Sequence, residues 1–323
     1  MRRIFVYESL SGGGEVGSEA ETIALLPQGL AMRDAIVADL LRLPDLAVTC
    51  AVSEHAAAGF VHPSLSCVAA RAGESALAFV QRESSQHDLA WIVAPESDGL
   101  LAAMHAAVGA PRWVGCGAAA IRVASSKRAT LAALAACGVP TPLDDVARMS
   151  ARRWVVKPDD GAGAMDTQVH PDHATALADW HQREHAGAAA TLEPFVEGQA
   201  LSVTMLAGPG FVQPLAFNEQ QITVSDDGRL HYLGVRVNAI DARHDPRATR
   251  LHTLALDVQR ALPGLRGVVG FDLVWHAEHG PFVIEVNPRV TCAYVGLSAA
   301  LGRNIAEETL LLHSLPEHAD AAA

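Results

Sequence analysis

Residues 267–289 read GVVGFDLVWHAEHGPFVIEVNPR, two apolar runs joined by a turn that contains glycine. This pattern predicts a β-hairpin. Glu285 and Asn287 are two residues apart in the second strand, so their side chains project from the same face. With the turn near 278–279, Asp272 of the first strand stands opposite Glu285 on that face. Three oxygen-bearing side chains gathered in this way suit Mg²⁺. A hairpin whose polar face simply meets solvent is the alternative.

The chain holds only two lysines, Lys127 and Lys157, among 24 basic residues. Lys157 ends an apolar strand, and the loop that follows it contains Gly161 and Gly163, which let backbone N–H groups approach a phosphate chain. Lys127 begins a helix after two serines. A compact ammonium group reaches between phosphate oxygens where a flat guanidinium group does not fit. We therefore predict that both lysines bind phosphate; two ordinary surface lysines are the alternative.

The segment 192–198, LEPFVEG, predicts a strand that ends at a glycine. A strand that crosses from one subdomain to the next exposes backbone N–H and C=O groups to which a purine can hydrogen-bond. Glu193 and Glu197 lie at the ends of this stretch, with Phe195 and Val196 between them. Without its context the segment is equally an ordinary strand with a turn.

Residues 1–115 alternate short apolar strands with helical patterns, which predicts a doubly wound parallel sheet. Ligands gather at the carboxyl ends of the strands in such sheets. The loops that contain Gly13, Glu96 and Asp98 lie there, and the two acidic residues suit a substrate that carries an ammonium group. Turn and helix-cap roles explain the same residues. After residue 115 the pattern changes to α+β with antiparallel hairpins.

Composition excludes several classes of function. The formal charge of −12 argues against a protein that grips nucleic acid. No run approaches the 18 apolar residues of a membrane span, and the N-terminus predicts a first strand rather than a signal peptide. The five scattered cysteines are typical of buried free thiols in a reducing compartment. These features together lead us to expect a cytoplasmic protein.

These pieces, in this order, resemble the ATP-grasp superfamily, whose members carry a lysine before the central domain, a lysine with a glycine-rich loop, an acidic hinge strand and an Asp…Glu-x-Asn metal set. The resemblance spans roughly residues 113–313. It implies two subdomains that clasp ATP, preceded by the α/β domain. The implied division is 1–115 for the substrate-side domain, 116–195 and 196–315 for the two ATP-grasp subdomains, and 316–323 for a frayed tail.

Three phrases, FVYESLSGGG, APESDGLL and VVKPDDGAG, look most like the ligases of methanofuran-type cofactor assembly, of the tyramine–glutamate ligase type. That resemblance implies an ADP-forming carboxylate–amine ligase that uses ATP and Mg²⁺ and works through an acyl phosphate. Glutamate and a small amine such as tyramine or tyrosine are the implied substrates, and a homodimer is possible. A ligase acting on other amino acids or peptides and a non-catalytic nucleotide-binding module are alternatives. A dinucleotide-binding oxidoreductase fits less well, because such a fold needs its glycine motif to open a helix directly, whereas three glycines of SLSGGGEVG are adjacent.

Two positions depart from the better-known pattern of the superfamily. A carboxylate that binds the ribose often follows the hinge glycine by two residues, where this chain has Ala200, so Glu197 is the substitute. An arginine often lies two residues before the metal-binding Asp, where this chain has Gly270. Arg289 or Arg236 could supply that cation. We expect Arg289, together with Lys157, to act in catalysis.

Overall fold

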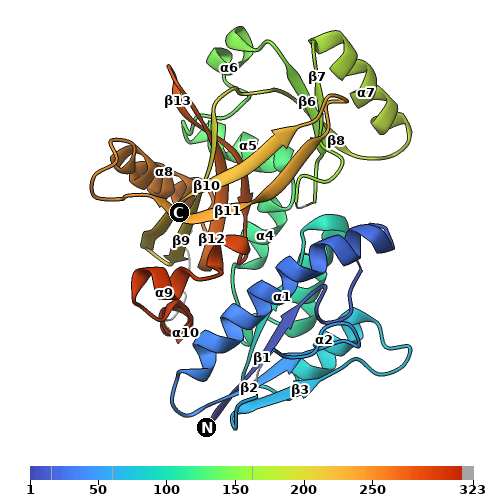
Figure 1. Ribbon diagram of the computed structural model, residues 1–323, viewed down its shortest axis with the longest axis vertical. Helices are drawn as coiled ribbons and strands as arrows, with labels where there is room; N and C mark the ends of the chain where they lie inside the picture. The colour runs from blue at the N-terminus through green and yellow to red at the C-terminus, as the bar shows by residue number, and fades with distance from the viewer. Residues whose placement is uncertain (16, 60, 162, 315–323) are drawn as a thin grey trace, which may run out of the picture.

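The computed structural model describes residues 1–15, 17–59, 61–161 and 163–314. The expected frayed tail, 316–323, and Ala162 of the glycine-rich loop lie outside these residues. The described chain forms one parallel sheet and two antiparallel sheets, with the parallel sheet at one end of the molecule (Figure 1). No helix in the described part is long and apolar enough to cross a membrane.

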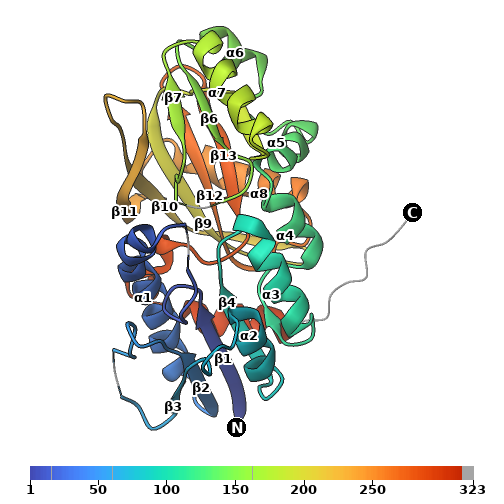
Figure 2. The same cartoon turned by 90° about the vertical axis from the view of Figure 1, so that its right-hand side faces the viewer.

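The parallel sheet has the strand order β3-β2-β1-β4-β5. Alternate residues of β1 enter different layers of core: Ile4 and Val6 pack with α1, whereas Phe5 and Tyr7 pack with α2. Helices therefore cover both faces, as the alternating sequence pattern predicts, and Figure 2 shows α1 on one side with α2 and α3 on the other. The elements are β1 Arg2–Glu8, α1 Glu19–Leu41, β2 Leu46–Ala51, β3 Leu65–Val68, α2 Ala76–Ser84, β4 Leu89–Val93, α3 Leu100–Val108 and β5 Trp113–Val114.

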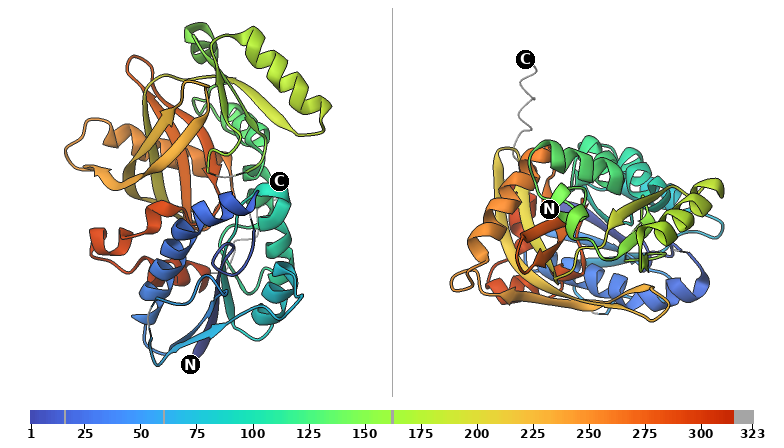
Figure 3. Two further views of the ribbon diagram at one scale, coloured as in Figure 1. Left: turned by 45° about the vertical axis from the view of Figure 1, so that its right-hand side comes forward. Right: turned by 90° about the horizontal axis from the view of Figure 1, so that it is seen from above.

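The second sheet is small and has the strand order β7-β6-β8. Val156, Ala176 and Ala190 form its compact core, with α7 packed on one face. Three short helices connect it along the chain to the parallel sheet (Figure 3). The elements of this region are α4 Ala118–Ala124, α5 Lys127–Ala136, α6 Asp145–Ser150, β6 Trp154–Pro158, β7 Gln168–His170, α7 His173–His185 and β8 Ala190–Pro194.

The third sheet is antiparallel, with the order β11-β10-β9-β12-β13. Val203 and Phe271 on one face share a core with Leu251 and Leu254 of α8. Residues of the opposite parity, such as Ser202, face the cavity described below. The elements are β9 Gln199–Gly208, β10 Phe211–Val224, β11 Leu230–Ile240, α8 Ala248–Ala261, β12 Gly267–His276 and β13 Gly280–Asn287.

The last helix differs from the prediction of one helix near 297–313. The chain forms two helices, α9 Leu297–Leu301 and α10 Ile305–Ser314. Gly302 ends the first of them in the left-handed conformation, with φ of 64°. The cysteine prediction was also wrong in part, because Cys67 and Cys137 are exposed.

The C-terminal segment returns to the N-terminal domain through a buried carboxylate on α1. Asp39 accepts hydrogen bonds from the Tyr294 hydroxyl, at 2.8 Å, and from the Ser298 hydroxyl, at 2.5 Å. Asn304 adds a bond from its side-chain amide to the Asp39 carbonyl, at 2.9 Å. These contacts hold the segment that follows β13 against the parallel sheet.

Candidate active site

A cavity of about 1030 Å³ lies where the three sheets meet. Its lining combines the carboxyl end of the parallel sheet, the loop between β6 and β7, and one face of the large antiparallel sheet. The residues predicted from sequence that line it are Lys127, Lys157, Gly161, Gly163, Glu193, Phe195, Val196, Glu197, Asp272, Glu285, Asn287, Arg289 and Asp98. Gly13, Glu96 and Arg236 are not among the lining residues.

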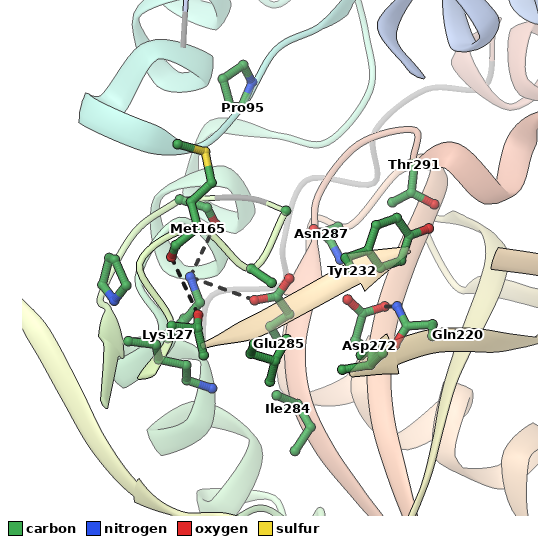
Figure 4. A pocket seen from close by; sticks show the side chains of 18 of the residues that line it. Pro95, Lys127, Met165, Gln220, Tyr232, Asp272, Ile284, Glu285, Asn287 and Thr291 are labelled. Atoms are coloured by element: carbon green, nitrogen blue, oxygen red, sulfur yellow. Dashed lines mark hydrogen bonds and ion pairs between the residues drawn. The ribbon is translucent and has the colours of Figure 1, made fainter. Parts of the chain in front are cut away.

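Asp272 and Glu285 stand directly opposite each other in the β12–β13 pair. Burial and the neighbouring charge of Glu285 raise the pKa of Asp272 to about 8. Gln220 donates a hydrogen bond from Nε2 to Oδ1 of Asp272, at 2.9 Å, and Asn287 lies on the same face (Figure 4). Two carboxylates that repel each other in a buried place fit a divalent cation, which relieves that repulsion.

The protein provides few ligands for such a cation. Among the described residues there is no group of three or more His, Cys, Asp or Glu side chains that could hold a metal ion. The two carboxylates and the amide of Asn287 therefore suit a metal that completes its shell with phosphate and water, which is the preference of Mg²⁺.

Lys127 begins α5 beneath the loop between β6 and β7. Its ammonium group donates to the carbonyl of Gly161, at 3.2 Å, and lies 3.7 Å from Oε2 of Glu285 (Figure 4). Asp159 fixes this arrangement, because its carboxylate accepts from the Ser126 hydroxyl, at 2.7 Å, and from the Arg128 N–H, at 2.9 Å. Lys127 thus connects the glycine-rich loop with the carboxylate pair.

Lys157 lies on β6 and forms an ion pair with Glu193 on β8, with Nζ and Oε2 2.9 Å apart. The two side chains are 6% and 2% exposed. The antiparallel register pairs Lys157 with Thr191 and Val155 with Glu193, so the charged groups meet diagonally on one face. Oε1 of Glu193 has no hydrogen-bond partner among the described residues.

The hinge after β8 is braced by Arg153. The Arg153 guanidinium donates two hydrogen bonds to the Glu197 carboxylate, at 2.8 and 2.9 Å. It also lies 4.4 Å from the centre of the Phe195 ring. Glu197 stays about half exposed, with its carboxylate at the edge of the cavity.

We call residues 159–161 and 163–166, between β6 and β7, the flap. Gly161 and Gly163 have φ of 109° and 74°, conformations that favour glycine. Asp160 accepts a hydrogen bond through Oδ2 from the backbone N–H of Asp98, at 2.7 Å. The flap is therefore tied to the loop that follows β4 of the parallel sheet.

Arg289 pairs with Glu96 across the domains, with Nη2 and Oε2 2.9 Å apart. Burial lowers the pKa of Arg289, but the charges of Glu96 and Glu285 outweigh it and the pKa is raised. Glu96 was predicted to face a substrate ammonium group; the structure instead directs it at Arg289, which compensates its charge.

Two further predicted substrate residues lie outside the cavity lining. Arg236 is exposed on β11 and pairs with Glu219, at 2.7 Å. Gly13 is exposed in the loop after β1, and its neighbours Leu10 and Glu15 reach the cavity in its place.

Sequence reasoning missed Glu8 and Gln220, which both line the cavity. Glu8 is the last residue of β1 and is 3% exposed. Its position at the carboxyl end of a parallel strand was the signal that could have identified it. Gln220 carried no such signal, because its contact with Asp272 depends on how β10 is placed within the sheet.

Comparison with known proteins gives two family matches. The model of the ATP-grasp domain matches residues 124–293, and that of the pre ATP-grasp 3 domain matches residues 46–121. Tyramine–L-glutamate ligase of Methanocaldococcus jannaschii is 25% identical over 67% of this chain and 60% of its own length. The enzyme of the same name from Methanocaldococcus fervens is 27% identical over 65% of this chain and 61% of its own length. The matched region is thus less than two thirds of either relative.

Among solved structures, an ATP-grasp superfamily protein from Archaeoglobus fulgidus superposes with a TM-score of 0.68 at 22% identity. The match covers 96% of this chain and 88% of that one. The similarity extends over all three sheets. The predicted architecture, a doubly wound parallel sheet followed by two antiparallel subdomains, is confirmed.

Proposed function

The chain belongs to the ATP-grasp family, and from this premise we propose that it is a carboxylate–amine ligase that converts ATP to ADP and phosphate. The observation that carries the proposal is the partly buried Asp272–Glu285 pair, with Lys127 beside it, in one cavity. An acidic pair next to a cation suits a metal-bound polyphosphate better than it suits any neutral ligand.

In this proposal the purine lies against the hinge, Glu193 to Glu197, where Oε1 of Glu193 is available to a ligand donor. The phosphates lie beneath the flap, between Lys127 and Lys157. Asp272, Glu285 and Asn287 would hold Mg²⁺, which would neutralise phosphate charge during transfer. Glu197, already oriented by Arg153, is the residue next to the ribose.

The reaction has two steps. An oxygen of the substrate carboxylate attacks the γ-phosphorus, the bond to the β-phosphate oxygen breaks, and an acyl phosphate and ADP result. The amine, in its neutral form, then attacks the acyl carbon through nitrogen, phosphate leaves with the bonding electrons, and the nitrogen releases a proton to the phosphate or to water as the amide forms. Arg289 neutralises charge on the transferred group and Lys157 orients the nucleotide, so the protein contributes mainly positioning and electrostatics.

The names of the two relatives support glutamate as the carboxylate substrate and tyramine, or a similar small amine, as the acceptor. Ligation of other amino acids or of peptides is the alternative within the same reaction class. The division at residues 115 and 195 and a cytoplasmic location belong to this proposal as well.

The test is an ADP-release assay with MgATP over a panel of amino acids and amines, with mass spectrometry of the products. We expect ADP release that depends on both a carboxylate and an amine, beginning with glutamate and tyramine. Glu285→Gln should abolish it. MgATP binding without ADP release across the whole panel would instead identify a nucleotide-binding module.

A further inference from the structure

The described cations that line the cavity all come from one side of it, whereas carboxylates line both sides. Every basic residue that lines it comes from beyond residue 115, namely Lys127, Arg153, Lys157 and Arg289. We call the lining beyond residue 115 the basic half; besides its cations it holds the carboxylates of Asp160, Asp166, Glu193, Glu197, Asp272 and Glu285. Within residues 1–115, the described lining contains no Lys, Arg or His. It contains three carboxylates instead, from Glu8, Glu15 and Asp98.

The N-terminal part of the lining is otherwise mostly apolar. It includes Leu10, Leu25, Met32, Pro95, Leu100 and Ala103. We call this part, with its three carboxylates, the acidic half of the cavity. In Figure 2 the first turns of α1, which contribute to it, lie just below β10 and β11. The basic half suits phosphates and a substrate carboxylate, whereas the acidic half repels anions and suits a cation with an apolar body.

Glu8 is the buried carboxylate of the acidic half. Its exposed fraction is 3%, whereas Glu15 and Asp98 are exposed. Oε1 accepts the backbone N–H of Leu10, at 3.2 Å, and Oε2 accepts that of Ser11, at 2.8 Å. These two bonds fix the orientation of the carboxylate at the end of β1.

No ion pair in the described part of the chain involves Glu8. Burial raises the pKa of Glu8, whereas the hydrogen bonds from Ser11 and Leu10 and the charge of Arg33 oppose that shift. The Arg33 guanidinium itself is occupied elsewhere. It pairs with Asp34, at 2.9 Å, and donates to the carbonyls of Ala56 and Ala57, both at 2.8 Å. A buried carboxylate that borders a cavity without a direct cationic partner is a receptor for a cation.

Gly29 gives Glu8 the space it occupies. A Cβ added at Gly29 would lie 2.4 Å from Oε2 of Glu8 and 2.7 Å from its Cδ. Gly29 is in the middle of α1, where glycine is less favourable than alanine. The helix thus carries an unfavourable residue at the one point where a side chain would displace this carboxylate.

Glu8 lines the same cavity as Arg289 and Cys292. Cys292, three residues after Arg289, contacts Gln28 of α1, with Sγ and Oε1 3.5 Å apart. Burial raises the pKa of the Cys292 thiol, Arg289 opposes that shift, and both Glu8 and Asp272 add to it. The charges of Glu8, Arg289 and Asp272 therefore all act on the Cys292 thiol.

We propose that Glu8 binds the ammonium group of the acceptor amine, and that the acidic half of the cavity selects primary amines with an apolar body. Glutamate, which carries two carboxylates, belongs in the basic half. Glu8 is then a specificity-determining residue. This inference rests on the proposed ligase function.

The test compares amines with alcohols of the same shape. Tyramine, phenethylamine and their two alcohol counterparts are titrated by calorimetry into the protein, saturated with Mg²⁺ and a non-hydrolysable ATP analogue. In the wild type each amine should bind about tenfold or more tightly than its alcohol. Glu8→Gln should reduce that ratio to roughly one, whereas Glu54→Gln, at a side chain 85% exposed, should keep it.

Turnover with glutamate and tyramine supplies the second measurement. Glu8→Gln should raise KM for tyramine about tenfold and leave KM for glutamate and for ATP unchanged. Should Glu8→Gln fold poorly, Glu8→Asp keeps the charge and shortens its reach, and the same rise in KM is expected.

An unchanged preference for amines in Glu8→Gln overturns the inference, and so does a rise in KM for glutamate alone. Wild-type protein that binds no amine better than its alcohol overturns it too. Absence of ADP release with every substrate pair would instead overturn the proposed function, while the calorimetry still decides the role of Glu8.

Discussion

Lys157 and Glu193 form an ion pair that is almost closed to solvent, although 36 residues separate them along the chain. Each charge compensates the other, and the pair holds β6 to β8 at the point where the flap and the hinge begin. Lys157 and Glu193 project from one face of the β6–β8 pair. In the proposed nucleotide site, the compact ammonium group would face Glu193 and a phosphate at once. The pair thereby connects the purine side of the proposed nucleotide site with the phosphate side.

Lys157→Arg tests this geometry. The guanidinium group is larger and planar, so we expect it to displace Glu193 and the flap, and to lower kcat/KM for ATP roughly 100-fold. Circular dichroism should show an intact fold. Arg42→Lys, at an exposed arginine, is the control for changing one cation into the other. Near wild-type activity of Lys157→Arg would contradict the inference that the two lysines occupy phosphate sites where an arginine does not fit.

The Asp272 carboxyl predicts a pH dependence of stability. Its pKa is raised from 3.8 to about 8 by burial and by Glu285, so the folded state keeps a proton that the unfolded state releases. The free energy of unfolding contributed by this group is fully present below pH 4 and is lost as the pH rises towards 8.

Asparagine at position 272 does not titrate, so the Asp272→Asn variant does not lose this stability as the pH rises. In EDTA, denaturant unfolding should show the variant gaining stability relative to the wild type between pH 5 and pH 8. Asp226→Asn, at an exposed position in the turn between β10 and β11, should show no such trend. A stability difference that stays constant with pH would mean that Asp272 is ionised across this pH range and that Glu285 does not raise its pKa.

Some of this site could be predicted from the sequence and some could not. The alternation of residues in 267–289 predicts the hairpin, and the expected pairing of Asp272 with Glu285 is found. That pairing also depends on a register shift between Asp272 and Leu273, which the sequence pattern does not predict. The Arg289–Glu96 pair joins residues 193 positions apart, and only the packing of the parallel sheet on the third sheet brings them together. The prediction of one continuous last helix was wrong because Gly302 adopts a left-handed conformation inside an otherwise helical pattern.

Glu96→Gln should lower stability as well as activity. Arg289 and Glu96 are 10% and 5% exposed, so removing one charge leaves the other buried and uncompensated, at a cost of about 3–5 kcal/mol in the free energy of unfolding. Arg229→Met breaks the exposed Arg229–Asp227 pair and should cost about 1 kcal/mol or less. Equal effects in the two variants would show that the Arg289–Glu96 pair is accessible to water in solution.

The flap offers a matched pair of glycines for the last prediction. Gly163 in the flap and Gly187 after α7 have φ of 74° and 80°, and an added Cβ at either would meet nothing within 4 Å. Alanine at each position therefore introduces the same backbone strain of about 1–2 kcal/mol without a clash. Gly163→Ala should shift the flap and raise KM for ATP about tenfold, whereas Gly187→Ala should lower stability slightly and leave KM for ATP unchanged. Equal KM values for ATP in both variants would mean that the flap does not cover the nucleotide.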